Sequence, residues 1–175
     1  MSKSIQRYTE RERMNHWVIA ILFFMAALSG LAFFHPSMFW LTNFFGGGSW
    51  TRILHPFLGV LMFVSFVGLT ARVWHHNKLD AADRKWLTAV SDVVSGREEN
   101  LQEVGRYNGG QKLLFWIMVA CMLVLLVTGV MFWQPWFANA FPIELRRLAV
   151  LLHSVSAAVL VIGVILPCSV LVVRL

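Results

Sequence analysis

Four long stretches of this 175-residue chain contain no Asp, Glu, Lys or Arg: 17–34, 53–71, 113–133 and 148–173. A helix rises about 1.5 Å per residue, so roughly 20 apolar residues cross the ~30 Å hydrocarbon core of a bilayer. Each stretch is expected to be α-helical, because backbone amides in hydrocarbon need internal partners. The pattern therefore predicts an all-α fold: a four-transmembrane-helix bundle forming a single membrane domain over 1–175.

The composition agrees with a membrane protein and excludes two other classes. Hydrophobic residues make up 58% of the chain and charged residues 14%, and the mean hydropathy is +0.65. A soluble domain carries about a quarter charged residues, and a disordered chain has few aromatic and β-branched ones. In a membrane protein, the positive charges behind the net charge of +6 indicate which side of the membrane each loop faces. The charge is therefore not read as a nucleic-acid surface, and no nucleic-acid partner is expected.

The Lys and Arg residues predict which way the spans point. Twelve lie before the first span, between the second and third spans, or after the fourth, and three lie on the other side. Because positive charge resists translocation, both termini are expected to be cytoplasmic, with a long inner loop between the second and third helices. Within that loop, residues 80–94 have helix-like apolar spacing, which is typical of a helix along the membrane surface.

Three histidines lie in or at the ends of predicted spans: His16, His55 and His153. Ionisable groups at membrane depth are costly and are therefore functional candidates. The predicted orientation places His55 and His153 at a similar depth near the outer face, where a haem iron could take two axial imidazoles from facing helices. Gly59 and Ala157 leave room for a flat macrocycle. The alternatives are hydrogen bonds between helices and, less favoured without Cys or carboxylate ligands at this depth, zinc.

Four segments occur in an order that is similar to one known family. The segments are Arg7-Tyr8-Thr9 through Arg13-Met14-Asn15-His16-Trp17, Arg52-Ile53-Leu54-His55-Pro56-Phe57, Val104-Gly105-Arg106-Tyr107-Asn108-Gly109-Gly110-Gln111-Lys112, and Leu152-His153-Ser154. Together they resemble the cytochrome b556 (gamma) subunit of membrane-bound respiratory formate dehydrogenases. The resemblance implies a four-helix subunit of the bacterial inner membrane that holds two b-type haems, one near each face.

The resemblance assigns His55 and His153 to the outer haem iron and His16 to the inner one. The family's partner for His16 lies fourteen residues after His153, where this chain has Pro167, which offers no ligating atom. We therefore expect one haem b per chain, where the family has two. The similarity stops near residue 166, so a truncated or altered C-terminal sequence is expected beyond that position.

The function that the resemblance implies is electron transfer without a formate-oxidising site in this chain. Electrons would come from a molybdenum or tungsten catalytic (alpha) subunit through a periplasmic iron–sulfur (beta) subunit, and would leave to menaquinone or ubiquinone. Asn108, Gly110 and Gln111 are the candidates for the quinone pocket, since the amides can donate hydrogen bonds and glycine permits close approach. The alternative for this segment is a helix-entry turn capped by Asn108.

Two other readings of the whole chain remain open from the sequence. A b-type cytochrome of a nickel–iron hydrogenase, or of a thiosulfate or polysulfide reductase, has a similar two-haem bundle. A non-redox membrane anchor or transporter would use the histidines only to bridge helices. Internal repeats and helices interrupted at mid-membrane are typical of transporters, and the sequence shows no such repeat.

Overall fold

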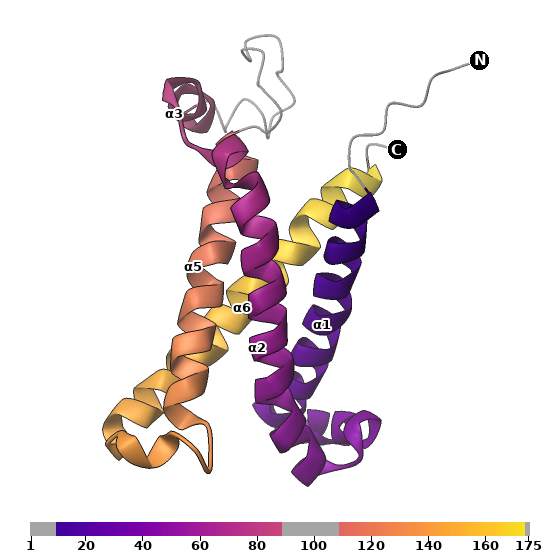
Figure 1. The fold of residues 1–175 in the computed structure, drawn as a ribbon, viewed down its shortest axis with the longest axis vertical. Coiled ribbons are helices and arrows are strands. Elements are labelled where there is room, and N and C mark those ends of the chain that lie inside the picture. The colour runs from indigo at the N-terminus through magenta and orange to yellow at the C-terminus, as the bar shows by residue number, and fades with distance from the viewer. Residues whose placement is uncertain (1–9, 89–108, 174–175) are drawn as a thin grey trace, which may run out of the picture.

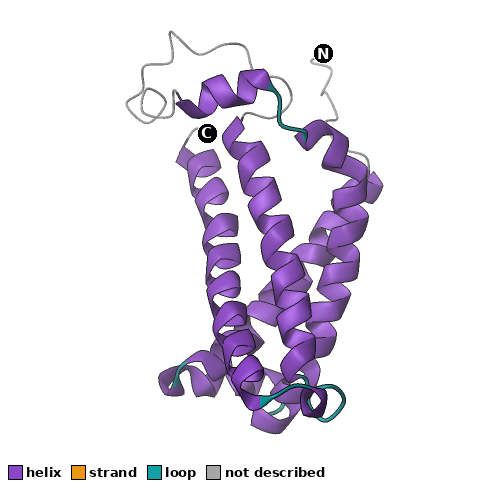
Figure 2. Ribbon diagram, turned by 90° about the vertical axis from the view of Figure 1, so that its left-hand side faces the viewer, coloured by secondary structure: helices purple, strands orange, loops and turns teal. Residues whose placement is uncertain are grey.

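The computed structural model describes residues 10–88 and 109–173. Four long helices form a bundle: α1 (Glu10–Phe34), α2 (Gly48–Val73), α5 (Gly109–Phe132) and α6 (Ile143–Val173) (Figure 1). Throughout the described ranges every regular element is a helix (Figure 2). The expected all-α class is therefore confirmed for this part of the chain.

Each of the four helices contains a segment that is long and apolar enough to cross a membrane. These segments are Arg13–Phe34, Gly48–Asn77, Gly109–Phe132 and Ile143–Ile165. They confirm the four predicted spans, but each starts four or five residues earlier than expected. Three of the predicted spans were started directly after a basic residue, namely Arg52, Lys112 and Arg147. Their starts were placed too late because a long basic side chain at a helix end can reach water while its backbone is already helical.

Short helical segments connect the long helices at the end of the bundle that carries the α1–α2 and α5–α6 turns. The 3₁₀ helix η1 (Pro36–Phe45) follows α1, and η4 (Ala138–Ala140) lies between α5 and α6. Gly46 and Gly47 have φ angles of 82° and 96°, a left-handed conformation that side-chain-bearing residues rarely adopt. They let the chain reverse from η1 directly into α2.

At the opposite end, α2 continues into η2 (Trp74–Asn77) and then α3 (Ala81–Thr88). The start of α1, the end of α6 and α3 all lie at this end (Figure 1). The helix predicted over 80–94 is confirmed for Ala81–Thr88, and residues 89–94 lie outside the described part of the chain. Its location along the membrane surface stays a prediction.

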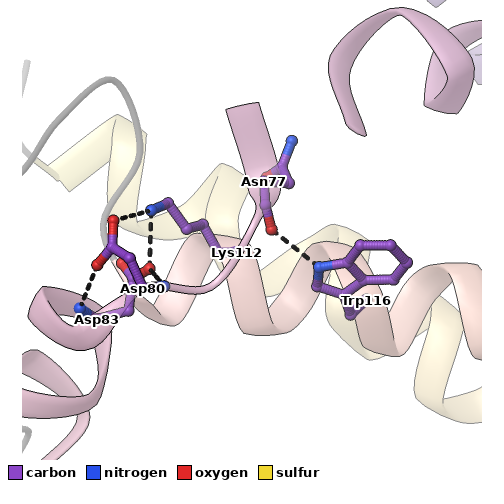
Figure 3. A network of polar contacts seen from close by, with 5 residues as sticks. All are labelled: Asn77, Asp80, Asp83, Lys112 and Trp116. Carbon is purple, nitrogen blue, oxygen red and sulfur yellow. Dashed lines mark hydrogen bonds and ion pairs between the residues drawn. The ribbon is translucent and has the colours of Figure 1, made fainter. Parts of the chain in front are cut away.

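A polar network fixes α3 to the start of α5 (Figure 3). The Lys112 ammonium bonds Asp83 at 2.8 Å and Asp80 at 3.5 Å. The backbone N–H of each aspartate donates to the other's carboxylate, at 2.8 and 3.0 Å, which is the reciprocal capping that stabilises a helix start. The Trp116 indole N–H donates to the Asn77 carbonyl at 2.9 Å. Among the described side chains, an ion pair and hydrogen bonds therefore connect α3 to the start of α5.

The bundle consists of two helix hairpins. Helix α1 packs along α2 and α5 along α6, and the hairpins meet through α2 with α5 and α1 with α6. All four helices contribute to one buried cluster: Leu22, Ala26, Met62, Met122 and Leu160. Most other large apolar side chains of the bundle are exposed, as expected for a surface that faces lipid.

Candidate metal centre

A cavity of about 480 Å³ lies between the buried cluster and the end of the bundle that carries η1 and η4. Its lining comes from all four long helices and is mostly apolar or aromatic. Met62, Met122 and Leu160 of the buried cluster form its floor, and Arg52 and Gln134 lie toward its outer end. A volume of 300–1,000 Å³ with few polar groups is typical of a small-molecule or cofactor site.

His55 on α2 and His153 on α6 face each other across this cavity. Their ring centroids are 6.2 Å apart and their planes are inclined by 65°. Each histidine precedes a residue of the cavity floor on its own helix by seven positions, Met62 for His55 and Leu160 for His153, or about 10.5 Å of helix rise. The two imidazoles therefore lie at the same depth, on different hairpins.

A hydroxyl group on the neighbouring helix holds each imidazole at Nδ1. Ser29 Oγ lies 2.8 Å from Nδ1 of His55, and Thr128 Oγ1 lies 3.0 Å from Nδ1 of His153. Ser29 is 0% exposed and Thr128 is 4% exposed, so water does not compete for these contacts. These two contacts use Nδ1 and leave the second ring nitrogen, Nε2, for another partner.

The spacing of the two rings fits one metal ion between them. With metal–imidazole bonds of about 2 Å and ~1.1 Å from nitrogen to ring centre, opposite ligands of one metal have centroids about 6 Å apart. The observed 6.2 Å agrees with that value. Among the described residues no group of three or more His, Cys, Asp or Glu could hold a metal ion, so a zinc-type ligand set is not formed there. The residues present fit a two-imidazole iron such as that of haem b.

The alternative role expected for these histidines, bridging helices by hydrogen bonds, is present as well. Ser29 lies on α1 and Thr128 on α5, so each imidazole does bond to a neighbouring helix. The two roles are compatible, since an imidazole has two nitrogens and each role uses a different one.

Aromatic rings and one cation surround the cavity near its outer end. Phe132 packs on the His153 ring with centroids 5.1 Å apart, and Trp133 packs on Phe57 at 5.2 Å. The Arg52 guanidinium carbon lies 5.9 Å from the centre of the Phe33 ring. Arg52 thus places a positive charge where the cavity lining meets the outer end of the bundle.

His16 lies on the same helix as Ser29 but thirteen residues earlier, about 20 Å along the axis. It is therefore not part of the His55–His153 site. Its ring is exposed and contacts Trp17 with centroids 6.3 Å apart. Pro167 lies within α6, but its side chain belongs to the part of the chain that is not described. Ligation of an inner haem by His16 stays a prediction.

The quinone candidates lie at the start of α5, away from the histidine cavity. Asn108 falls outside the described residues. Gly110 is half-buried and Gln111 is exposed, both in the first turn of α5 next to Lys112. Neither Gly110 nor Gln111 lines the cavity around His55 and His153, and the role of all three candidates stays a prediction.

Sequence reasoning missed the residues that support the two histidines. Ser29 and Thr128 are each followed by a glycine, Gly30 and Gly129, in the first helix of their hairpin. A Cβ atom at Gly30 would lie 3.2 Å from Cε1 of His55, and one at Gly129 would lie 3.3 Å from Cε1 of His153. Both hairpins therefore have a hydroxyl residue followed by glycine in the first helix and the dipeptide Leu-His in the second. This short local repeat is the signal in the sequence that points to the two supports.

Comparisons with known proteins show which proteins this chain is similar to. A family model described as prokaryotic cytochrome b561 matches residues 7–166. The cytochrome b556(Fdn) subunit of the nitrate-inducible formate dehydrogenase of Escherichia coli (strain K12) is 42% identical over 160 residues, covering 91% of this chain and 74% of that protein. The cytochrome b556(fdo) subunit of formate dehydrogenase from the same strain is 45% identical over 159 residues, with the same coverage. The formate dehydrogenase cytochrome b556 subunit of Haemophilus influenzae is 41% identical over 160 residues, covering 91% of this chain and 67% of that protein.

Proposed function

This chain belongs to the prokaryotic cytochrome b561 family, and from that membership we infer that it is the cytochrome b556 subunit of a formate dehydrogenase, which transfers electrons within the membrane. Relatives with that name are 41–45% identical over 91% of the chain. The four membrane-crossing helices agree with a subunit of this kind. The observation that carries the proposal is the His55–His153 pair across a cofactor-sized cavity.

The cofactor that the family implies is haem b, which supplies one-electron redox chemistry when bound. His55 and His153 would hold its iron through Nε2, since each Nδ1 is already bonded to a hydroxyl. The apolar lining of the cavity excludes water from the site. Arg52 is suited to pair with the carboxylates of the haem edge, because its guanidinium lines the outer part of the cavity.

The direction of electron transfer follows from the orientation of the bundle. The excess of Lys and Arg at the α3 end of the chain supports a cytoplasmic location for that end, in a bacterial inner membrane. The His55–His153 site would then receive electrons on the periplasmic side from an iron–sulfur subunit, which a molybdenum or tungsten subunit supplies. Quinone would be reduced at the inner end, near Asn108, Gly110 and Gln111. His16 would ligate an inner haem there only with a second ligand, and Pro167 does not provide one.

The test is haem binding by the full chain purified in detergent. We expect one haem b per chain by pyridine haemochrome assay, with a reduced-minus-oxidised spectrum typical of a b-type cytochrome. His55→Ala and His153→Ala should each abolish the bound haem. His35→Ala should not, because His35 is exposed, its imidazole bonds Ser37 at the start of η1, and it does not line the cavity.

Three outcomes would contradict parts of this proposal. A colourless wild-type protein would favour a non-redox anchor or transporter. Two haems per chain would contradict the inference from Pro167, and full haem content in either cavity variant would contradict the assignment of the site. Co-purification with hydrogenase subunits, rather than with formate-oxidising ones, would contradict the assigned complex.

A further inference from the structure

The two hairpins support their histidines in the same way. In the first hairpin Ser29 of α1 bonds His55 of α2 at 2.8 Å, and in the second Thr128 of α5 bonds His153 of α6 at 3.0 Å. In both cases the hydroxyl is on the first helix of the hairpin, the imidazole is on the second, and the atom bonded is Nδ1. One cavity is thus flanked by two equivalent supports, each from a different part of the chain.

The hydrogen of each hydroxyl group is already in use. Ser29 Oγ donates to the carbonyl of Ala26 at 3.0 Å, and Thr128 Oγ1 donates to the carbonyl of Val124 at 2.6 Å. A hydroxyl has a single hydrogen and two acceptor lone pairs, so an oxygen that donates to its carbonyl accepts from its imidazole. A hydroxyl that accepts in this way requires the hydrogen of the neighbouring ring to be on Nδ1.

We propose that Ser29 and Thr128 are positioning residues that fix the Nδ1–H tautomer and the ring plane of His55 and His153, so that both Nε2 lone pairs face the cavity. Metal-binding histidines generally donate their second ring N–H to an outer partner, which orients the ring and raises its basicity. Here that partner is a buried hydroxyl on each hairpin. The expected effect on a bound cofactor rests on the proposed haem site, but the tautomer itself does not depend on haem.

The glycine after each hydroxyl completes the support. Because a Cβ at Gly30 or Gly129 would approach Cε1 of the ring to 3.2 or 3.3 Å, the imidazole lies close against the backbone of the neighbouring helix. The hydroxyl therefore restrains the ring at Nδ1 while the helix backbone restrains it at Cε1. Rotation that would carry Nε2 out of the cavity is opposed by both contacts.

The first test uses the haem-free full chain, with ¹⁵N-labelled histidine followed by NMR at neutral pH. We expect His55 and His153 to carry their hydrogen on Nδ1. In Ser29→Ala and Thr128→Val the Nδ1–H population should fall at the affected ring only, and Ser29→Thr and Thr128→Ser should keep it. Ser154→Ala is the matched control, since that hydroxyl bonds the carbonyl of Val150 in its own helix.

The second test uses the haem-loaded chain. The g values of low-spin ferric haem depend on the angle between the two axial ring planes, so Ser29→Ala and Thr128→Val should each change the electron paramagnetic resonance spectrum. Their midpoint potentials should rise, because an imidazole without a partner at Nδ1 donates less charge to iron. Haem affinity should fall by roughly 10- to 100-fold, as for other losses of an outer-shell partner. The Thr and Ser exchanges should restore all three values.

These outcomes separate this inference from the proposed function. Nε2–H tautomers in the wild-type protein, or wild-type spectra and potentials in Ser29→Ala and Thr128→Val, would overturn the positioning role and leave the haem site intact. A wild-type chain that shows the Nδ1–H tautomers but binds no haem would overturn the haem site instead. Should the Val and Ala variants fail to accumulate, Thr128→Ser compared with Thr128→Cys retains the test, since the two differ only in oxygen against sulfur.

Discussion

Gly59 on α2 gives a direct test of whether the cavity between His55 and His153 holds a cofactor. Gly59 lines the cavity, and a Cβ at this position would meet no atom within 4 Å. Gly68, nine residues further along α2, is equally open, but it is exposed and does not line the cavity. Gly59→Leu and Gly68→Leu therefore add the same side chain to the same helix. Gly59→Leu places it inside the cavity, and Gly68→Leu places it on the exposed surface.

In the haem-free protein neither replacement should lower stability. Glycine in a helix interior is about 0.8 to 1.0 kcal/mol less favourable than alanine, and leucine ranks close to alanine, so Gly59→Leu and Gly68→Leu should be equal to or slightly more stable than the wild type. With haem the two should differ. A side chain that occupies cofactor space causes overpacking of about 1–3 kcal/mol, which corresponds to a roughly 5- to 150-fold loss of haem affinity for Gly59→Leu.

The assay is haem titration of the purified chains, followed by thermal unfolding with and without haem. We expect haem to raise the unfolding temperature of the wild type and Gly68→Leu, and to raise it much less for Gly59→Leu. A folded Gly59→Leu protein with wild-type haem affinity would show that this cavity is not the haem site. Equal weakening in both glycine variants would point to a general effect on α2 rather than to occupation of the cavity.

Two further predictions concern the α3 anchor. Lys112 is 8% exposed, and Asp83→Ala leaves its ammonium with Asp80 at 3.5 Å as the remaining carboxylate within the described residues. We therefore expect the free energy of unfolding in mixed micelles to fall by about 3 kcal/mol. A fall below about 0.5 kcal/mol, typical of a surface pair, would contradict a buried role. The backbone N–H of Asp83, and then the Lys112 charge, lowers the pKa of Asp80. The stabilisation of α3 by the Asp80 carboxylate is therefore complete above its ordinary pKa and is lost as pH falls through the lowered pKa. The protection of the α3 amides from hydrogen exchange should stay unchanged between about pH 8 and pH 5, once the intrinsic exchange rate is taken into account. A loss of protection within that window would contradict the lowered pKa.

The sequence alone determined the class of the fold and the candidate ligands. A long uncharged stretch in hydrocarbon has to form a helix to satisfy its backbone amides. The four spans therefore followed from the absence of charge, although each starts four or five residues earlier than predicted and the second ends later, at Asn77. His55 and His153 were recognisable because an ionisable side chain at membrane depth is costly. Their shared depth followed from helix rise and orientation, both of which are properties of local sequence.

Only the tertiary structure decided which groups meet at the site. The 6.2 Å between the two rings depends on how two hairpins pack, and no spacing along the chain encodes that distance. Ser29 and Thr128 are ordinary residues in apolar runs until helix packing places their hydroxyls against Nδ1 of a histidine about 25 positions away. The Lys112–Asp83 pair is likewise a contact between segments distant in sequence. Hydrogen bonds and ion pairs act over about 3 Å, so the partners of a residue are fixed by packing, while burial in a membrane is fixed by composition.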